Sequence, residues 1–254
     1  MTTYQGGKKR IGKRIAKVIK RVENSLIEND ILPYLEPFCG MCGVLVHFAA
    51  VNDREVYASD IHPDLILMWK AVQKGWKPPQ KCSKREYSKL RTSPPSPKRA
   101  FMGFAGSFGG NFFSGGFRIK NGGPDFLGQA YRGLMKAAKD VKNVKFDGPI
   151  SYDEYDPKNM LIYCDPPYQG NKLGPKLFQE FDHEKFWKTM RKWSRNNLVF
   201  ISEWTAPKDF VKIWSTESVN ANSSATVRYI DCLFVHKDLA DIIPTDVMDE
   251  ISGY

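Results

Sequence analysis

The sequence predicts an α/β fold with a mostly parallel central sheet and an inserted lobe of short helices and loops. Short apolar segments typical of strands alternate with helical segments before residue 73 and after residue 143. A glycine turn follows the first of these strands, and a carboxylate ends the second. Proline, glycine and phenylalanine interrupt the alternation in between. We therefore assign 1–73 and 143–254 to one domain and 74–142 to the inserted lobe.

The first part of the chain has the pattern of a nucleotide-binding α/β unit. Apolar residues recur at helical spacing from Ile11 to Leu26, which predicts an amphipathic helix. The next predicted elements are a strand over 32–38, a glycine turn over 40–43, a helix over 44–51, a strand over 55–60 and a helix over 65–72. The second strand ends on Asp60, 20 residues after Gly40.

The lobe is predicted to end with a helix over 129–141, after which strands and helices alternate again. The predicted elements are a strand over 160–164, a helix over 184–193, a strand over 198–202 and a late pair around 226–235. The acidic tail from Asp238 is expected to dock loosely or to fray.

Composition points to a protein of the cell interior. The 254 residues contain no apolar run near the ~20 that a membrane helix needs, and no secretory apolar region follows Met1. Five irregularly spaced cysteines argue against a disulfide framework. We expect a cytoplasmic protein, or one of a host cell's cytoplasm or nucleus if the source is viral. Cys39 and Cys42 have the spacing of half a zinc site but lack a second pair, so no metal is predicted.

Positive charge is concentrated in the middle of the chain. Residues 74–145 hold 16 Lys and Arg against 3 Asp and Glu, whereas the whole chain has a net charge of +10. Such a block favours a polyanionic partner, because phosphate neutralisation releases counterions. A solvated surface is the alternative, and it explains single basic runs better than one segregated block.

The most informative motif is Asp165-Pro166-Pro167-Tyr168, which follows the apolar strand over 160–164. Prolines fix φ and carry no N–H, so the backbone after Asp165 is rigid and its carbonyls can accept bonds. The aromatic ring of Tyr168 follows these carbonyls in the motif. Two acceptors on an aromatic amine favour the pyramidal nitrogen that attacks an electrophile. The motif therefore predicts a clamp for the amino group of a nucleobase, and a capped Pro-Pro turn is the alternative.

The glycine turn and Asp60 predict a second site, for an adenosyl group. Glycines allow close approach of a ligand, and a carboxylate after the second strand can accept from two ribose hydroxyls. A dehydrogenase would share this pattern, but Met41 and Cys42 interrupt a full GxGxxG motif, and nothing supplies the acid–base pair of an oxidoreductase.

With these motifs in place, the chain resembles the Dam-like, α-group D12 class of DNA adenine-N6 methyltransferases. The resemblance rests on Tyr4-Gln5-Gly6-Gly7-Lys8, Glu36-Pro37-Phe38-Cys39-Gly40, Asp60-Ile61, Asp165-Pro166-Pro167-Tyr168 and Phe181-Asp182-His183. It covers most of the chain outside the lobe. It implies a Rossmann-like methyltransferase that uses S-adenosyl-L-methionine, releases S-adenosyl-L-homocysteine and needs no metal.

The resemblance also implies roles for particular residues. The catalytic set is Asp165, Pro166, Pro167 and Tyr168. The cofactor set is Tyr4, Gly7, Lys8, Glu36, Pro37, Phe38, Gly40, Asp60, Ile61, Phe146, Asp147 and Asp165. The DNA set is Lys9, Arg10, Asn111, Phe112, Arg118 and Lys120. The phenylalanines expected either to enter the DNA stack or to form the lobe's core are Phe104, Phe108, Phe112, Phe113 and Phe117.

The partner implied by the resemblance is double-stranded DNA from which the target adenine is flipped. A cognate restriction endonuclease can accompany such an enzyme, which is expected to act as a monomer or a weak dimer on DNA. Three alternatives stay open: transfer to cytosine N4, transfer to RNA, and a degenerate DNA-binding protein. Cys42, which stands where a second glycine is common, and the loose late motif at Arg228-Tyr229 favour the last of these.

Overall fold

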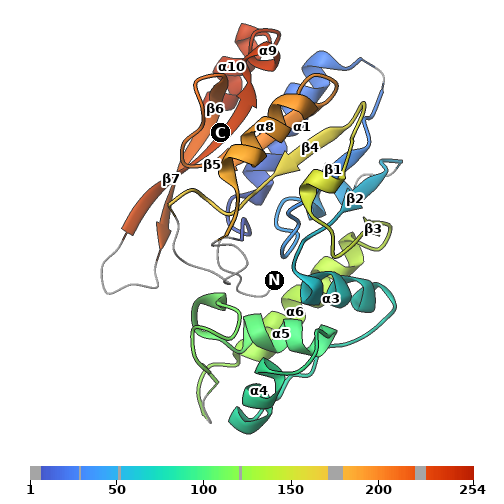
Figure 1. The fold of residues 1–254 in the computed structure, drawn as a ribbon, viewed down its shortest axis with the longest axis vertical. Helices are drawn as coiled ribbons and strands as arrows, with labels where there is room; N and C mark the ends of the chain where they lie inside the picture. Colours follow the sequence, from blue (N-terminus) through green and yellow to red (C-terminus); the bar gives the residue numbers. More distant parts are fainter. Residues whose placement is uncertain (1–6, 29, 51–52, 120–121, 171–179, 221–226) are drawn as a thin grey trace.

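The structure, a computed structural model, describes residues 7–28, 30–50, 53–119, 122–170, 180–220 and 227–254. Tyr4 and Lys120 of the predicted sites lie outside this part of the chain. Within it, seven strands form one sheet in the order β3-β2-β1-β4-β5-β7-β6 (Figure 1). They are β1 Tyr34–Glu36, β2 Val56–Ala58, β3 Lys145–Phe146, β4 Leu161–Cys164, β5 Leu198–Glu203, β6 Phe210–Asn220 and β7 Val227–His236.

Most of the sheet is parallel. Strands β1 to β5 pair parallel with one another, and β7 runs antiparallel between β5 and β6. This arrangement confirms the predicted α/β class and its Rossmann-like, mostly parallel sheet. Because carboxyl ends of parallel strands share one edge, the side chains that follow β1, β2, β4 and β5 come together there.

Helices cover both faces of the sheet. In the described residues they are α1 Gly12–Leu26, α2 Val46–Ala49, α3 Pro63–Gln73, α4 Lys84–Arg91, α5 Pro97–Ala105, α6 Phe126–Asp140, α8 His183–Trp193, α9 Lys237–Ala240 and α10 Thr245–Ser252. Two 3₁₀ turns, η1 Phe108–Gly110 and η2 Tyr152–Glu154, complete them. No helix in the described ranges is both long and apolar enough to cross a membrane.

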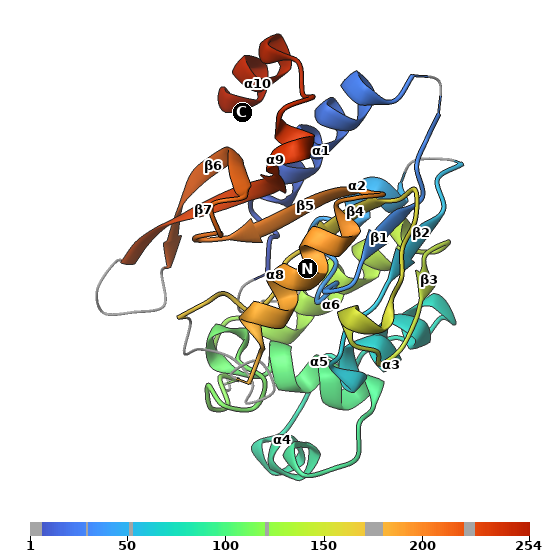
Figure 2. The same ribbon diagram turned by 45° about the horizontal axis from the view of Figure 1, so that its top comes forward.

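Strand periodicity separates two hydrophobic clusters, one on each face of the sheet. Along β4, Leu161 and Tyr163 belong to the cluster that packs against α1, α2, α3 and α6, whereas Ile162 and Cys164 belong to the cluster under α8. Side chains of a strand alternate between faces, so a fully buried strand is apolar throughout. Figure 2 shows α8 lying across the sheet on the side opposite to α1.

The lobe residues pack directly on the sheet domain. Helix α5 places Phe101, Met102 and Phe104 in the same cluster as Leu65 and Trp69 of α3. Figure 1 shows α4 and α5 at one end of the molecule, beside the chain that leads from β2 into α3. The division at residues 74–142 stays a prediction, because one continuous core joins the two parts.

Three elements differ from the sequence expectation. Helix α2 has only four residues, although the apolar run over 44–51 predicted a longer helix. The two-residue strand β3 beside β2 was not predicted. The expectation of a loose tail is wrong, because α9 and α10 bury apolar side chains in the main cluster. Those side chains are Leu239, Ile243, Val247 and Ile251.

Candidate active site

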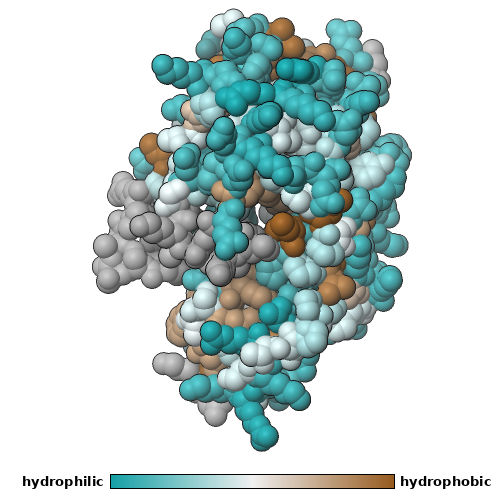
Figure 3. Space-filling view, viewed as in Figure 1, coloured by the Kyte–Doolittle hydropathy of each residue, from teal (hydrophilic) through white to brown (hydrophobic). Residues whose placement is uncertain are grey.

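Four carboxylates lie where parallel strands end. Asp165 directly follows β4, Asp60 lies two residues beyond β2, and Glu36 and Glu203 are the last residues of β1 and β5. All four are largely buried. The face of the molecule in Figure 3 is hollowed between the upper part, which holds the sheet, and the lower part, which holds α4 and α5.

Asp165 forms an ion pair with Lys8. The Lys8 Nζ lies 2.8 Å from Asp165 Oδ1, 3.9 Å from Asp231 Oδ1 and 4.6 Å from the centre of the Tyr168 ring. Burial raises the pKa of Asp165, and the Lys8 charge opposes that rise. Burial alone would lower the pKa of Lys8, but Asp165 and Asp231 hold it above its ordinary value. Each charge therefore favours the ionised form of its partner, and a nitrogen donor is held against the predicted catalytic carboxylate.

The Tyr168 ring is fixed by its neighbours. Its hydroxyl donates to Asp231 Oδ1 at 3.4 Å, and the Trp204 ring meets it edge-on with centroids 5.3 Å apart. Burial raises the pKa of Tyr168 well above its ordinary value, so the phenol stays neutral. A neutral, immobilised ring beside a carboxylate gives a planar ligand a surface for stacking.

Glu203 anchors the chain that follows Tyr168. Its carboxylate accepts from the backbone N–H of Gln169 at 2.7 Å and of Trp204 at 2.6 Å. Burial raises its pKa to about 7. The sequence interpretation missed this residue, although the same signal was present: an acid ends a buried strand, as Asp60 and Asp165 do. Glu203 fixes the segment after Tyr168 to the end of β5.

Asp60 organises the glycine turn. Its Oδ2 accepts from Gly40 N at 2.9 Å and its Oδ1 accepts from His62 N at 2.8 Å. The Trp69 indole N–H donates to Gly40 O at 2.9 Å and holds the other side of the turn. Burial raises the pKa of Asp60 to about 6. A carboxylate offers about four lone-pair sites, so two remain for a ligand's hydroxyls.

The turn itself has the backbone conformation that glycine favours. Gly40 has φ +45° and Cys42 has φ +56°, in the left-handed region. Cysteine thus takes the conformation of the glycine that it replaces, at a strain of about 1–2 kcal/mol.

The N-terminal segment packs on this turn. A side chain at Gly43 would have its Cβ 3.1 Å from the Lys8 carbonyl carbon and 3.2 Å from Lys8 N, and one at Gly12 would have it 2.2 Å from Gly43 O. Backbone contact of this kind requires glycine. It brings Lys8, and Gly7 before it, to the same edge as Asp60 and Asp165.

The remaining cofactor candidates have different surroundings. Ile61 is 43% exposed next to Asp60 and offers an apolar surface. Phe146 is buried and stacks on Trp69, with centroids 5.8 Å apart. Asp147 is exposed after β3, and its backbone N–H donates to Ala58 O at 2.9 Å.

Two further candidates lie in the interior. Glu36 accepts from the Tyr34 hydroxyl at 2.7 Å, and burial raises its pKa well above the ordinary value. Phe38, which follows Pro37, packs in an aromatic cluster with Tyr152 and Phe186, at centroid distances of 5.2 and 5.9 Å. The ring of Phe38 therefore supports α8.

The predicted DNA set is only partly brought together. Lys9 and Arg10 are exposed just before α1. Phe112 is half-buried with its edge on the His62 ring, at a centroid distance of 4.5 Å. The Arg118 guanidinium lies 4.0 Å from the centre of the Phe126 ring. Asn111 is half-buried, and its side-chain oxygen has no hydrogen-bond donor among the described residues.

The lobe phenylalanines divide into core and surface. Phe104 and Phe113 are buried and so belong to the core, whereas Phe108 is 53% exposed. Phe117 packs on Tyr87 with centroids 4.9 Å apart. Of the described phenylalanines proposed to enter a DNA stack, Phe108 is the exposed one.

Cys39 and Cys42 are buried thiols of the glycine turn, and burial raises the pKa of both. Within the described ranges, no three His, Cys, Asp or Glu side chains are grouped so that they could hold a metal ion.

Curated protein sequences include no match to the chain. An rRNA methyltransferase from Streptomyces viridochromogenes matches at 13% identity and a TM-score of 0.39, covering 91% of this chain and 87% of that one. A putative RNA methyltransferase from Pyrococcus horikoshii matches at 9% identity and a TM-score of 0.41, covering 87% and 83%.

The family model described as D12 class N6 adenine-specific DNA methyltransferase matches residues 4–95. This range holds the Gly-Gly-Lys segment, the glycine turn and Asp60, and it ends inside the lobe. The match covers less than half of the 254 residues, and over this range the chain is similar to the D12 class N6 adenine-specific DNA methyltransferase family.

Proposed function

We propose that the chain is a DNA methyltransferase that transfers a methyl group from S-adenosyl-L-methionine to N6 of an adenine flipped out of duplex DNA. One observation carries the proposal: Lys8 Nζ is hydrogen-bonding distance from Asp165 Oδ1 and close to the Tyr168 ring. The Asp165-Pro166-Pro167-Tyr168 motif can thus hold a nitrogen donor against the Asp165 carboxylate and beside the Tyr168 ring. The amino group of a flipped adenine needs these same two contacts.

The residues at Asp60 fit an adenosyl donor. Two free lone-pair sites on a buried carboxylate suit the ribose hydroxyls, and the exposed Ile61 suits the face of the adenine. Packing of Lys8 on Gly43, together with the Lys8–Asp165 ion pair, brings the glycine turn and Asp165 to the same edge. When bound, S-adenosyl-L-methionine supplies an electrophilic methyl group and leaves as S-adenosyl-L-homocysteine.

In this proposal, Asp165 accepts an N–H of the target amino group and Tyr168 stacks on the base. Accepting the N–H pulls the nitrogen lone pair out of conjugation, which favours attack more in the transition state than in the ground state. Glu203 holds the segment after Tyr168 in place by accepting from the backbone N–H of Gln169. No covalent enzyme intermediate is needed.

Duplex DNA is the proposed partner because the lobe presents its basic residues to solvent. Helix α4 exposes Lys84, Arg85, Lys89 and Arg91, and α6 exposes Arg132, Lys136 and Lys139. Exposed cations of this kind neutralise phosphates and make binding strongly dependent on salt. Base contacts, which set the recognised sequence, would come from other residues.

The test is incubation of the protein with unmethylated duplex DNA and S-adenosyl-L-methionine, followed by mass spectrometry of the digested nucleosides. N6-methyladenine is the expected product. N4-methylcytosine, or methylation of RNA alone, would move the acceptor to one of the alternatives. Donor binding without any methylated product would instead favour a DNA-binding protein that has lost catalysis.

Donor binding should weaken in acid, because the pKa of Asp60 is about 6. Above pH 7 the carboxylate is ionised and accepts from the ribose. Below pH 6 it binds a proton and loses acceptor strength, so affinity should fall by up to about tenfold per pH unit. Calorimetric titration with S-adenosyl-L-homocysteine between pH 5 and 8 measures this. Asp60→Asn is the control, with weak binding that no longer varies with pH; an unchanged wild-type affinity at pH 5 would remove Asp60 from the donor site.

Phe108→Ala should slow methylation of a fully paired target by about tenfold, because the exposed ring is proposed to fill the gap that a flipped base leaves. Flipping a mispaired target adenine costs less free energy, because the base is less well held in the duplex. On such a substrate the loss of rate in Phe108→Ala should therefore shrink to about twofold. Single-turnover rates on the two duplexes measure the difference. Ile242→Ala removes an equally exposed apolar side chain far from the lobe and should change neither rate. Equal losses on both duplexes would rule out this role for Phe108.

A further inference from the structure

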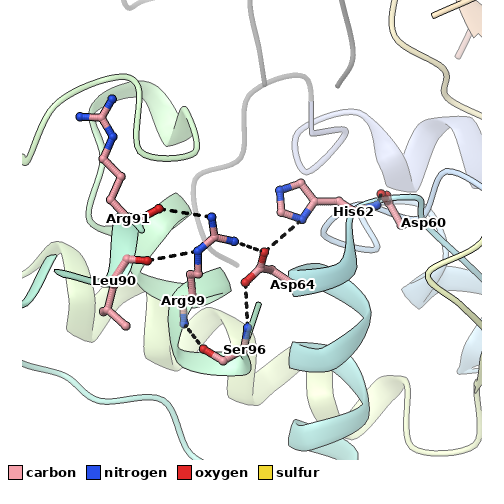
Figure 4. A network of polar contacts seen from close by, with 7 residues as sticks. All are labelled: Asp60, His62, Asp64, Leu90, Arg91, Ser96 and Arg99. Atoms are coloured by element: carbon pink, nitrogen blue, oxygen red, sulfur yellow. Dashed lines mark hydrogen bonds and ion pairs between the residues drawn. The ribbon is translucent and has the colours of Figure 1, made fainter. Parts of the chain in front are cut away.

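A buried carboxylate joins the donor site to the lobe. Asp64 lies four residues after Asp60, in the first turn of α3, and is fully buried. Its Oδ1 accepts from Ser96 N at 2.9 Å, and its Oδ2 forms an ion pair with Arg99. Figure 4 shows these contacts converging on Asp64 from the loop before α5 and from α5 itself. The Asp64 side chain, on the helix α3 that follows Asp60, thus holds the start of α5.

Arg99 extends the connection to α4. Its Nε donates to Leu90 O at 3.1 Å and its Nη2 reaches Arg91 O at 3.4 Å, at the last turn of that helix. Its own backbone N–H donates to Ser96 Oγ, which caps α5, at 3.2 Å. A guanidinium bonded in several directions fixes orientation far better than a single contact does. The end of α4 and the start of α5 therefore share one anchor, Asp64.

His62 forms a second connection, from the donor acid to the aromatic part of the lobe. Its backbone N–H donates to Asp60 Oδ1 at 2.8 Å. Its ring packs on Phe104 and Phe112, with centroids 5.6 and 4.5 Å apart. The ring is buried; its Nδ1 makes no hydrogen bond among the described residues but lies 3.8 Å from Asp64 Oδ2, as Figure 4 shows, so the ring contacts both the lobe and this carboxylate. A shift of Asp60 would therefore move His62, and with it the rings of Phe104 and Phe112 that pack on His62.

We propose that Asp64 and Arg99 are positioning residues that couple the two substrates: they hold the lobe in its DNA-binding orientation when the donor fixes Asp60. The proposal rests on the proposed function, because it takes the donor to bind at Asp60 and DNA to bind the lobe. Linkage makes such coupling reciprocal, so DNA must tighten donor binding by the same factor as the donor tightens DNA binding.

The experiment measures the affinity for S-adenosyl-L-homocysteine by calorimetry, with and without a saturating duplex that the methylation assay has identified as a substrate. The wild type should bind it about fivefold or more tightly with DNA present. In Asp64→Asn and in Arg99→Lys the two affinities should agree within about twofold, while binding without DNA persists. Unchanged wild-type affinity on adding DNA overturns the inference, as does full coupling in both variants.

A second buried ion pair provides a matched control. Arg54 donates to both Glu23 oxygens at 2.9 and 2.7 Å and to Leu32 O at 2.8 Å, joining α1 to the sheet away from the lobe. Arg54→Lys should lower the melting temperature as Arg99→Lys does and should leave the coupling intact. Loss of coupling in Arg54→Lys as well would make the effect one of general stability and overturn the inference.

Hydrogen exchange adds a measurement on the wild type alone, which does not depend on whether a variant folds. Binding of S-adenosyl-L-homocysteine should slow exchange of backbone amides in 84–105 by about fivefold or more. Unchanged exchange there would overturn the inference. Failure of the proposed function is distinct, since it appears as the absence of methylated nucleoside on every duplex tested.

Discussion

Asp165→Ala is expected to slow methyl transfer by about 10²–10³-fold while leaving donor binding within a few-fold of wild type. The substitution removes the acceptor that makes the target nitrogen nucleophilic, a contact that strengthens only in the transition state. It does not touch the bonds of Asp60 to Gly40 and His62, which shape the donor site. Single-turnover rates with saturating DNA, together with calorimetry of donor binding, separate the two effects.

Asp209→Asn is a suitable control for this substitution. Asp209 also pairs with a cation, accepting from Arg191 Nη2 at 2.8 Å, but it lies beside α8 and β6 rather than at the strand ends. Its substitution should leave the rate unchanged. An Asp165→Ala protein that keeps more than about a tenth of the wild-type rate would contradict the role given to Asp165.

The strand ends were predictable because each buried strand and the carboxylate that follows it lie in one short, continuous segment of the sequence. An apolar run that ends in an acid predicts a buried parallel strand with a carboxylate at its carboxyl end. This reasoning located Asp60 and Asp165, and β4 lies within the range predicted for it. It also explains why β3 was missed: a strand of two residues is too short to carry a periodic signal.

Contacts between distant segments were not predictable from local pattern. The N-terminal Lys8 reaches Asp165 only because its backbone packs on Gly43, and no single segment encodes that approach. The resemblance assigned Lys8 to the cofactor set, and the structure places its Nζ beside Asp165 and the Tyr168 ring. Tertiary packing decided the position.

The lobe and the tail show the limits of composition as a guide. Phe104 and Phe113 sit among glycines in a segment without clear period, yet they are buried, and only the fold separates them from the exposed Phe108. In the tail, the acidic side chains hide a four-residue spacing from Leu239 to Ile251 that predicts one apolar helical face. The acidic composition of the tail, taken alone, led to the wrong expectation that the tail docks loosely or frays.

Lys8→Met is expected to move the pH dependence of catalysis upward. Burial raises the pKa of Asp165, and the Lys8 charge 2.8 Å away opposes the rise. Without that charge the pKa of Asp165 should lie higher than in the wild type, and a protonated carboxyl is a poor acceptor for the target amine. The rate at pH 7 should therefore fall by about tenfold or more and recover in part as the pH rises. A pH–rate profile under single-turnover conditions measures the shift.

The sign of this effect separates an electrostatic role of Lys8 from a merely structural one. A packing defect would lower the rate equally at every pH, whereas loss of a stabilising charge lowers it most where Asp165 is protonated. Lys8→Arg keeps the charge and should keep the wild-type profile, at a reduced rate because the guanidinium is larger. Lys9→Met removes the exposed neighbouring charge, so it should weaken DNA binding and leave the profile unmoved. If Lys8→Met and wild type have profiles of the same shape, Asp165 does not depend on Lys8 for its ionisation, and the ion pair serves only to fold the N-terminal segment onto the glycine turn.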